Sequence, residues 1–172
     1  MVCASELHGL SRKFGDLQAA HRTLLELRNI LAESGERKHK AQGIVEAIRT
    51  SGPYRWVGLY DVSLSMGLVS NIAWSGPSAP GYPTFPATEG LTSRAIATKK
   101  TFNVGDVASD QDYLTALSST RSEIIIPIFS KDGERVVGTI DVESERCNAF
   151  DSTAQTVLEE FARILQPFWS ER

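Results

Sequence analysis

The spacing of hydrophobic residues changes along this chain, and this change constrains the fold more than any other feature. Over about the first fifty residues, apolar positions such as Leu17, Leu24 and Leu31 recur at roughly helical spacing. From Tyr54 onward the apolar residues alternate with polar ones, as is typical of β-strands. Helical spacing returns after Asp151. Antiparallel strands with helices at both chain ends indicate an α+β fold.

Two helices are expected before the first strand. The Ser-Gly-Glu segment at 34–36 interrupts the helical spacing, and Ser34 is the expected N-cap of the second helix. We expect that helix to continue to about Arg49 and to end at the Ser-Gly-Pro segment of 51–53.

Two hairpins supply most of the expected sheet. The expected strands, in chain order, are 54–62, 68–74, 101–104, 122–130 and 134–144. A Ser-rich turn separates the first two strands, and Lys-Asp-Gly at 131–133 separates the last two. We expect a tight Asp-Gly turn in this second hairpin.

The segment between the two hairpins is long and irregular. Residues 75–83 hold three of the seven prolines and are expected to form a loop. A short helix is expected at 89–100 and a single helical turn at 114–118. Because long loops in compact domains tend to be binding loops or lids, we expect this segment to contribute to a site.

Composition excludes several functional classes. The 172 residues have a formal net charge of -3 and no concentrated basic stripe, which argues against nucleic-acid binding. No apolar run approaches the roughly 18 residues of a membrane span, and the first residues lack a secretory signal. Two isolated cysteines, Cys3 and Cys147, do not form a disulfide framework. We expect a cytoplasmic protein that does not contact a membrane.

Metal and cofactor chemistry is not expected. The three histidines, His8, His21 and His39, all lie in the N-terminal helices, and none has a Cys or acidic cluster at ligand spacing. No glycine-rich phosphate loop is present. The sequence therefore predicts neither a metal site nor a bound cofactor.

Four segments together resemble the GAF domain. They are VGLY at 57–60, EGLTSRAIATKK at 89–100, SEIIIPIF followed by RVVGTIDVES at 122–144, and NAFDSTAQTVLEEFA at 148–162. The resemblance covers about residues 40–170. It implies a central antiparallel sheet of about five to six strands. Two N-terminal helices and a C-terminal helix would cover one face, and loops and short helices the other.

Within that superfamily the chain most resembles the free methionine-(R)-sulfoxide reductases. These enzymes attack the sulfoxide with a cysteine thiolate and resolve the product with another cysteine. Alignment on the shared motifs places the family's three cysteines at about Tyr82, Thr92 and Ala116, none of which carries sulfur. Cys3 and Cys147 match none of these positions. We therefore expect no catalytic residue and no reductase activity.

Two carboxylates of the reductase pattern survive, Glu123 and Asp141. The resemblance suggests that they lie in the pocket and could hold an ammonium or amide group. Independently, both interrupt apolar strands, and a buried carboxylate is costly unless it is paired or hydrogen-bonded. The alternative is that both lie at strand ends in solvent or bond a backbone N–H. The alternation along the strands leaves their faces open.

Aromatic side chains provide a second set of candidate ligand contacts. The aromatic candidates are Trp56, Tyr60, Trp74, Tyr82 and Tyr113, and Thr92 completes the expected pocket. Aromatic walls suit a planar or cationic ligand. Core packing is the more frequent role for residues such as Trp56 and Trp74, whereas Tyr82 and Tyr113 lie in loops that could act as a lid.

The sequence predicts a non-catalytic GAF-type sensor of an unidentified small molecule. We divide it into 1–35, a helix that could dimerise, and 36–172, the GAF-like domain. Wide apolar stripes on the terminal helices favour a homodimer, although the first helix could instead pack within its own chain. Two alternatives remain, a reductase using an unrecognised thiol and a purely structural dimerisation module.

Overall fold

The computed structural model describes residues 4–114 and 117–170. In chain order its elements are α1 (Ala4–Ala32), α2 (Arg37–Thr50), β1 (Trp56–Ser63), β2 (Leu68–Ser75), β3 (Thr84–Pro86), α3 (Gly90–Thr98), β4 (Phe102–Val104), the 3-10 helix η1 (Val107–Ser109), β5 (Ser122–Phe129), β6 (Val136–Ser144), α4 (Ser152–Leu165) and α5 (Pro167–Ser170). None of the described helices is long and apolar enough to cross a membrane.

The strands form one six-stranded antiparallel sheet in the order β3-β2-β1-β6-β5-β4. The expected α+β fold and both expected hairpins are confirmed. The sixth strand, β3, is an addition to the five strands expected by range, and it pairs with Leu68–Ser70. Three residues are too few to show a period of two, so the sequence pattern could not reveal it.

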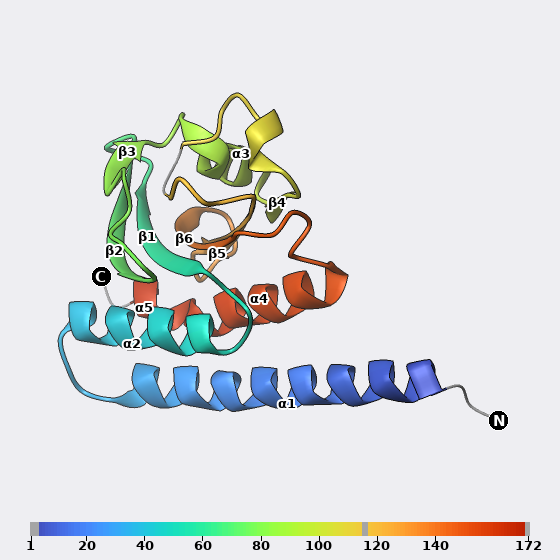
Figure 1. The fold of residues 1–172 in the computed structure, drawn as a ribbon. Helices are drawn as coiled ribbons and strands as arrows, with labels where there is room; N and C mark the ends of the chain where they lie inside the picture. Colours follow the sequence, from blue (N-terminus) through green and yellow to red (C-terminus); the bar gives the residue numbers. More distant parts are fainter. Residues whose placement is uncertain (1–3, 115–116, 171–172) are drawn as a thin grey trace.

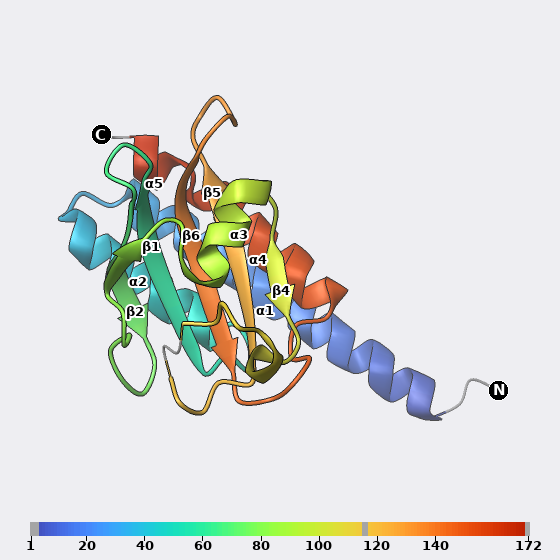
Figure 2. The ribbon, with the colours of Figure 1, turned by 90° about the horizontal axis from the view of Figure 1, so that it is seen from above.

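The molecule is layered, with the sheet between helices and loops (Figure 1). Helices α2 and α4 cover one face of the sheet, which we call the helix face. Helix α3 and the loops around it cover the opposite face, which we call the cavity face (Figure 2). Helix α1 packs against α2 and α4 rather than on the sheet, so it forms a further outer layer.

The main hydrophobic core lies between the helix face and the helices. Alternate residues of β5 and β6 face it because side chains of a strand point to opposite faces in turn. The strand residues in this core include Ile124, Ile126, Ile128, Ile140 and Val142, and the helix residues include Ile44, Ile48, Leu158 and Phe161. These nine side chains are at most 1% exposed.

The C-terminal segment closes the end of this core. The ring of Trp169 lies so close to Gly138 that a Cβ there would be 2.3 Å from the indole Cζ2. The indole Nε1 donates to Asp61 Oδ1 at 2.8 Å, and Arg37 donates to both Asp61 oxygens. The glycine on β6 therefore allows the chain end to pack directly against the sheet.

Three local expectations were wrong in detail. Helix α2 begins after Glu36, which makes no side-chain cap bond, so Ser34 is not its N-cap. The β5–β6 hairpin closes through a longer loop between Ser130 and Arg135, with Gly133 at φ +75°. Residues 114, 117 and 118 are not helical, while 115–116 lie outside the described residues. Asp132 stabilises the longer loop by accepting from the Glu134 N–H at 3.0 Å.

Candidate functional site

A small cavity lies on the cavity face of the sheet, under α3. Its volume is about 30 Å3, close to the space that one water occupies in the liquid. The lining residues are Tyr60, Tyr82, Phe85, Gly90, Leu91, Thr92, Leu114, Glu123, Asp141 and Glu143. Five of the eight expected ligand-binding residues therefore meet at one place, although they come from five different segments of the chain.

Three of the lining residues are carboxylic acids, and we call them the carboxyl trio: Glu123, Asp141 and Glu143. Glu123 on β5 is directly opposite Glu143 on β6, and Asp141 lies two residues before Glu143 on the same face. Their exposed fractions are 8%, 5% and 1%. Like charges directly opposite each other on neighbouring strands destabilise a sheet. The trio is thus a costly arrangement for a structural role alone.

Burial strongly perturbs these acids. It raises the pKa of Asp141 to about 7 and that of Glu143 to about 7. The pKa of Glu123 is raised well above its usual value by burial and by the charges of Glu143 and Asp141. Burial also raises the pKa of the facing Tyr60 hydroxyl, so the phenol stays protonated. The cavity therefore holds protons at neutral pH.

Hydroxyl donors hold two of the carboxyl groups in place. The Thr120 hydroxyl donates to Glu143 Oε2. The Thr92 hydroxyl, near the start of α3, donates to Asp141 Oδ2 at 3.3 Å. The other oxygen of Asp141, Oδ1, is buried and makes no hydrogen bond of good geometry in the described part of the chain, although the Thr139 hydroxyl on the same strand lowers the pKa of Asp141 against the effect of burial. A buried acceptor without a donor is costly, so Asp141 is ready to accept from a ligand.

The start of α3 also closes the cavity from above. Gly90 begins the helix at φ +70°, a conformation that favours glycine. A Cβ at this position would lie 2.9 Å from Leu114 Cδ1, so Leu114 contacts the glycine closely. Arg94, one turn further along α3, forms ion pairs with Asp110 and Asp112. These ion pairs fix the loop that carries Leu114.

The expected aromatic residues divide into two groups. Tyr60 and Tyr82 line the cavity, and Tyr82 is 49% exposed at its mouth. Trp56 is fully buried, and its indole donates to the Ser78 carbonyl at 3.1 Å. Trp74 packs beside it in the same hydrophobic cluster. Tyr113 packs against a smaller cluster beneath α3. The structure thus places Trp56, Trp74 and Tyr113 in packing positions beside the cavity.

Glu143 is the principal site residue that sequence reasoning missed. A period-two reading from Asp141 places Glu143 on the same face of the strand, so this signal was available. Phe85 and Leu114 were also missed, because nothing in their local sequence distinguishes a cavity wall from ordinary packing. The third cysteine-equivalent position, Ala116, lies outside the described residues.

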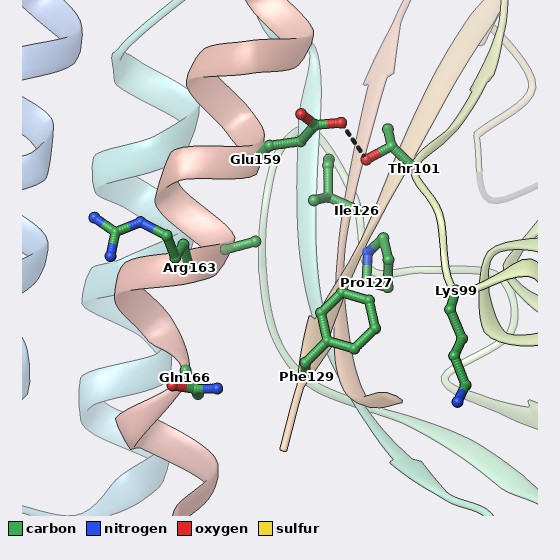
Figure 3. A pocket seen from close by; sticks show the side chains of 9 residues that line it. Lys99, Thr101, Ile126, Pro127, Phe129, Glu159, Arg163 and Gln166 are labelled. Carbon is green, nitrogen blue, oxygen red and sulfur yellow. Dashed lines mark hydrogen bonds between the residues drawn. The ribbon is translucent and has the colours of Figure 1, made fainter. Parts of the chain in front are cut away.

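A larger hollow of about 340 Å3 lies between α4 and the end of β5 (Figure 3). Its polar groups are already bonded within the chain. Thr101 donates to Glu159 at 2.7 Å, and Arg163 bonds Glu160 and points away from the hollow. Lys99 donates to the Glu134 carbonyl at 2.6 Å. Despite its size, the hollow offers a ligand fewer unused polar groups than the cavity does.

Among the described residues, neither a thiol nor a set of metal ligands is found at the cavity. Cys147 is exposed in the turn after β6, where Arg121 donates to its sulfur at 3.2 Å. Within the described residues, no group of three or more His, Cys, Asp or Glu side chains is arranged to hold a metal ion.

Comparisons with known proteins agree with this architecture. The GAF domain family model matches residues 41–166. GAF domain-containing protein A of Dictyostelium discoideum is 25% identical over 152 residues, which cover 88% of this chain and 93% of that protein. Free methionine-R-sulfoxide reductase of Saccharomyces cerevisiae is 32% identical over 77 residues, which cover 45% of this chain and 42% of that protein.

A solved structure extends the similarity to three dimensions. The X-ray structure of free methionine-R-sulfoxide reductase from Neisseria meningitidis in complex with its substrate has a TM-score of 0.78 and 27% identity. The match covers 88% of each chain. The chain is therefore similar both to GAF domain proteins and to free methionine-R-sulfoxide reductases.

Proposed function

The chain belongs to the GAF domain family, and we propose that it is a non-catalytic domain that binds a small molecule carrying an ammonium or amide group. The observation that carries this proposal is the carboxyl trio around one cavity. Among the described residues that line the cavity, none is Lys, Arg or His. Three buried acids without a positive partner are costly to keep, and a ligand that donates hydrogen bonds would offset that cost.

The size of the cavity favours the head of such a ligand. About 30 Å3 accommodates one ammonium group, which is close to water in size. The rest of the molecule would pass between Tyr82 and Leu114 toward solvent. Because Leu114 contacts Gly90 closely, we expect the loop that carries it to shift when a ligand longer than one heavy atom binds.

The cavity surface supports the non-catalytic part of the proposal. Tyr82 and Thr92, at two of the positions that the resemblance assigns to reductase cysteines, contribute oxygen atoms instead of sulfur. Reduction of a sulfoxide by this class of enzyme requires a thiolate nucleophile. Cys147 is exposed in a turn and is not among the residues that line the cavity.

A thermal-shift screen tests the binding proposal. The protein is screened with free amino acids, methionine sulfoxide, other primary amines and neutral compounds of similar size. A ligand at about 100 times its Kd adds about 2.7 kcal/mol of stability. We expect compounds with an ammonium or amide group to raise Tm. If only compounds without a hydrogen-bond donor do so, the proposal is wrong.

The Asp141→Asn variant connects any such shift to the cavity. Loss of the charged acceptor should weaken binding of an ammonium ligand by roughly 1–3 kcal/mol. Glu145→Gln is the matched control, because Glu145 is an exposed acid on the same chain segment and pairs with Arg55. Equal affinity of Asp141→Asn and the control would remove Asp141 from the site.

A turnover assay tests the absence of catalysis. Purified protein is incubated with free methionine-(R)-sulfoxide and a thiol reductant, and methionine is measured. We expect no turnover above that of the Cys147→Ser variant. Turnover that disappears in Cys147→Ser would instead establish the reductase alternative with an unrecognised thiol.

We also propose that α1 mediates a homodimer. Its 29 residues extend about 43 Å, whereas the 14 residues of α4 extend about 21 Å. The N-terminal part of α1 accordingly projects past its neighbours (Figures 1 and 2). Leu17 and Leu25 on this helix are 57% and 45% exposed. Sedimentation equilibrium should show a dimer that Leu17→Glu dissociates, and a monomer at all concentrations would refute the proposal.

A further inference from the structure

The ionisable groups around the cavity are all acidic. The carboxyl trio comes from β5 and β6, the Tyr60 hydroxyl from β1, and the Tyr82 hydroxyl from the loop before β3. Helix α3 contributes the neutral Thr92, and the loop before β5 contributes the neutral Leu114. No described lining residue is basic, so no side chain of the cavity wall balances an ionised carboxylate.

Basic side chains on or next to the elements that line the cavity bond acids outside it. Arg94 on α3 pairs with Asp110 and Asp112. Arg55, before β1, pairs with Glu145, and Arg121, before β5, pairs with Asp106. These ion pairs leave the three arginines engaged with acids other than the carboxyl trio. Ionising all three acids would place like charges close together in a volume that excludes solvent.

We propose that the carboxyl trio exchanges bound protons for the positive charge of the ligand, so that ligand affinity rises with pH across the neutral range. This inference rests on the proposed function and specifies how the same site is regulated. In the free protein below about pH 7, the carboxyl groups of Asp141 and Glu143 keep their protons. When an ammonium group enters, its N–H groups donate to the carboxylate oxygens, and the displaced protons pass to solvent.

The geometry of the carboxyl trio favours exchange of its protons over a state in which all three acids stay ionised or all three stay neutral. Glu143 directly faces Glu123 across the strand pair, and Asp141 lies two residues before Glu143 on the same face of the sheet. Burial raises the pKa of Asp141 and of Glu143 to about 7. Acids that titrate near neutrality change protonation at small energetic cost, so a ligand charge can displace their protons.

The probe for the test is methylammonium, the smallest organic cation with a primary ammonium head. Its Kd is measured by NMR chemical-shift titration at constant ionic strength, at about pH 5.5 and about pH 8. Release of one proton from a group that titrates near neutrality predicts affinity at least about tenfold higher at the higher pH. Methanol, a neutral probe of similar size, should show no such dependence.

Variants assign the effect to the trio. Glu143→Gln removes one exchangeable proton and should reduce the affinity ratio between the two pH values, whereas the exposed control Glu145→Gln should keep the full ratio. Asp141→Asn provides a second test if Glu143→Gln fails to fold. A full ratio in a folded Glu143→Gln or Asp141→Asn protein would overturn the assignment to these acids.

The two proposals fail in different ways. If methylammonium binds wild-type protein with the same affinity at both pH values, proton exchange is wrong and ligand binding stands. If methylammonium binds at neither pH, and the amine screen also leaves Tm unchanged, the cation site and the exchange are both overturned.

Discussion

The two faces of the central sheet come from the same strands but differ in chemistry. On β5 and β6 the helix face presents Ile124, Ile140 and Val142, which pack among helix side chains. The cavity face of the same strands presents Glu123, Asp141 and Glu143 around a small space. The first arrangement is typical of a core that stabilises the fold. The second is costly without a ligand, and the proposed binding function rests on it.

The largest expected effect comes from damaging the helix face. Ile140→Ala removes a fully buried side chain from the main core, so it should lower the free energy of unfolding by about 2–5 kcal/mol. Urea denaturation at neutral pH measures the change. Ligand affinity should remain unaltered at temperatures where the variant is folded. A loss below about 1 kcal/mol would contradict the assignment of this face as the stabilising one.

A neutral replacement on the cavity face should have the opposite sign. Glu143→Gln removes an acid whose pKa is raised by burial, so it should increase stability at about pH 8 by on the order of 1–3 kcal/mol. Urea denaturation of both proteins at this pH measures the difference. Destabilisation at that pH would show that Glu143 supports the fold rather than a ligand.

The pH dependence of the wild-type protein follows from the same acids. Their folded pKa of about 7 exceeds the unfolded value near 4, so the folded state binds more protons between these limits. Stability from this source is complete below about pH 4 and declines as pH rises through about 7. Chemical denaturation between about pH 5 and 8 should show this decline, and Glu143→Gln should flatten it.

The smallest of these effects is expected at a hydroxyl. Thr92→Val removes the donor to Asp141 Oδ2 while keeping the size of the side chain. It should weaken ligand binding by about 1 kcal/mol. Thr98→Val is a suitable control, because that hydroxyl bonds only the carbonyl one turn earlier on the same helix. Equal ligand affinities of the two variants would exclude Thr92 from positioning Asp141.

The helix face was more predictable from sequence than the cavity face. Continuous apolar runs such as 122–130 predict buried strands. Apolar residues at helical spacing predict the helices that cover these strands. The motif resemblance located Glu123 and Asp141, but alternation alone left their faces open because β5 is buried on both sides. The bonds from Thr92 and Thr120 depend on how distant segments meet, which no local pattern encodes.

The same reasoning explains why the sequence predicted some cavity-lining aromatic residues correctly and others not. Trp56 and Tyr60 lie on one strand at positions of equal parity, yet Trp56 is fully buried and only Tyr60 lines the cavity. Their ring centroids are 6.4 Å apart over Gly58, so the packing of one defines the position of the other. Whether a residue lines the cavity or packs in the core therefore depends on the three-dimensional positions of both side chains.

The most direct test of the central claim compares each amine ligand with the alcohol in which a hydroxyl replaces the ammonium group, so that the positive charge is lost and the size is kept. Isothermal titration at about pH 8 measures both on wild-type protein and on Asp141→Asn. We predict that wild-type protein favours the free amine at least about tenfold, and that Asp141→Asn loses most of this preference. Equal affinity of the amine and its alcohol analogue for wild-type protein would contradict the claim that the carboxyl trio recognises a cation.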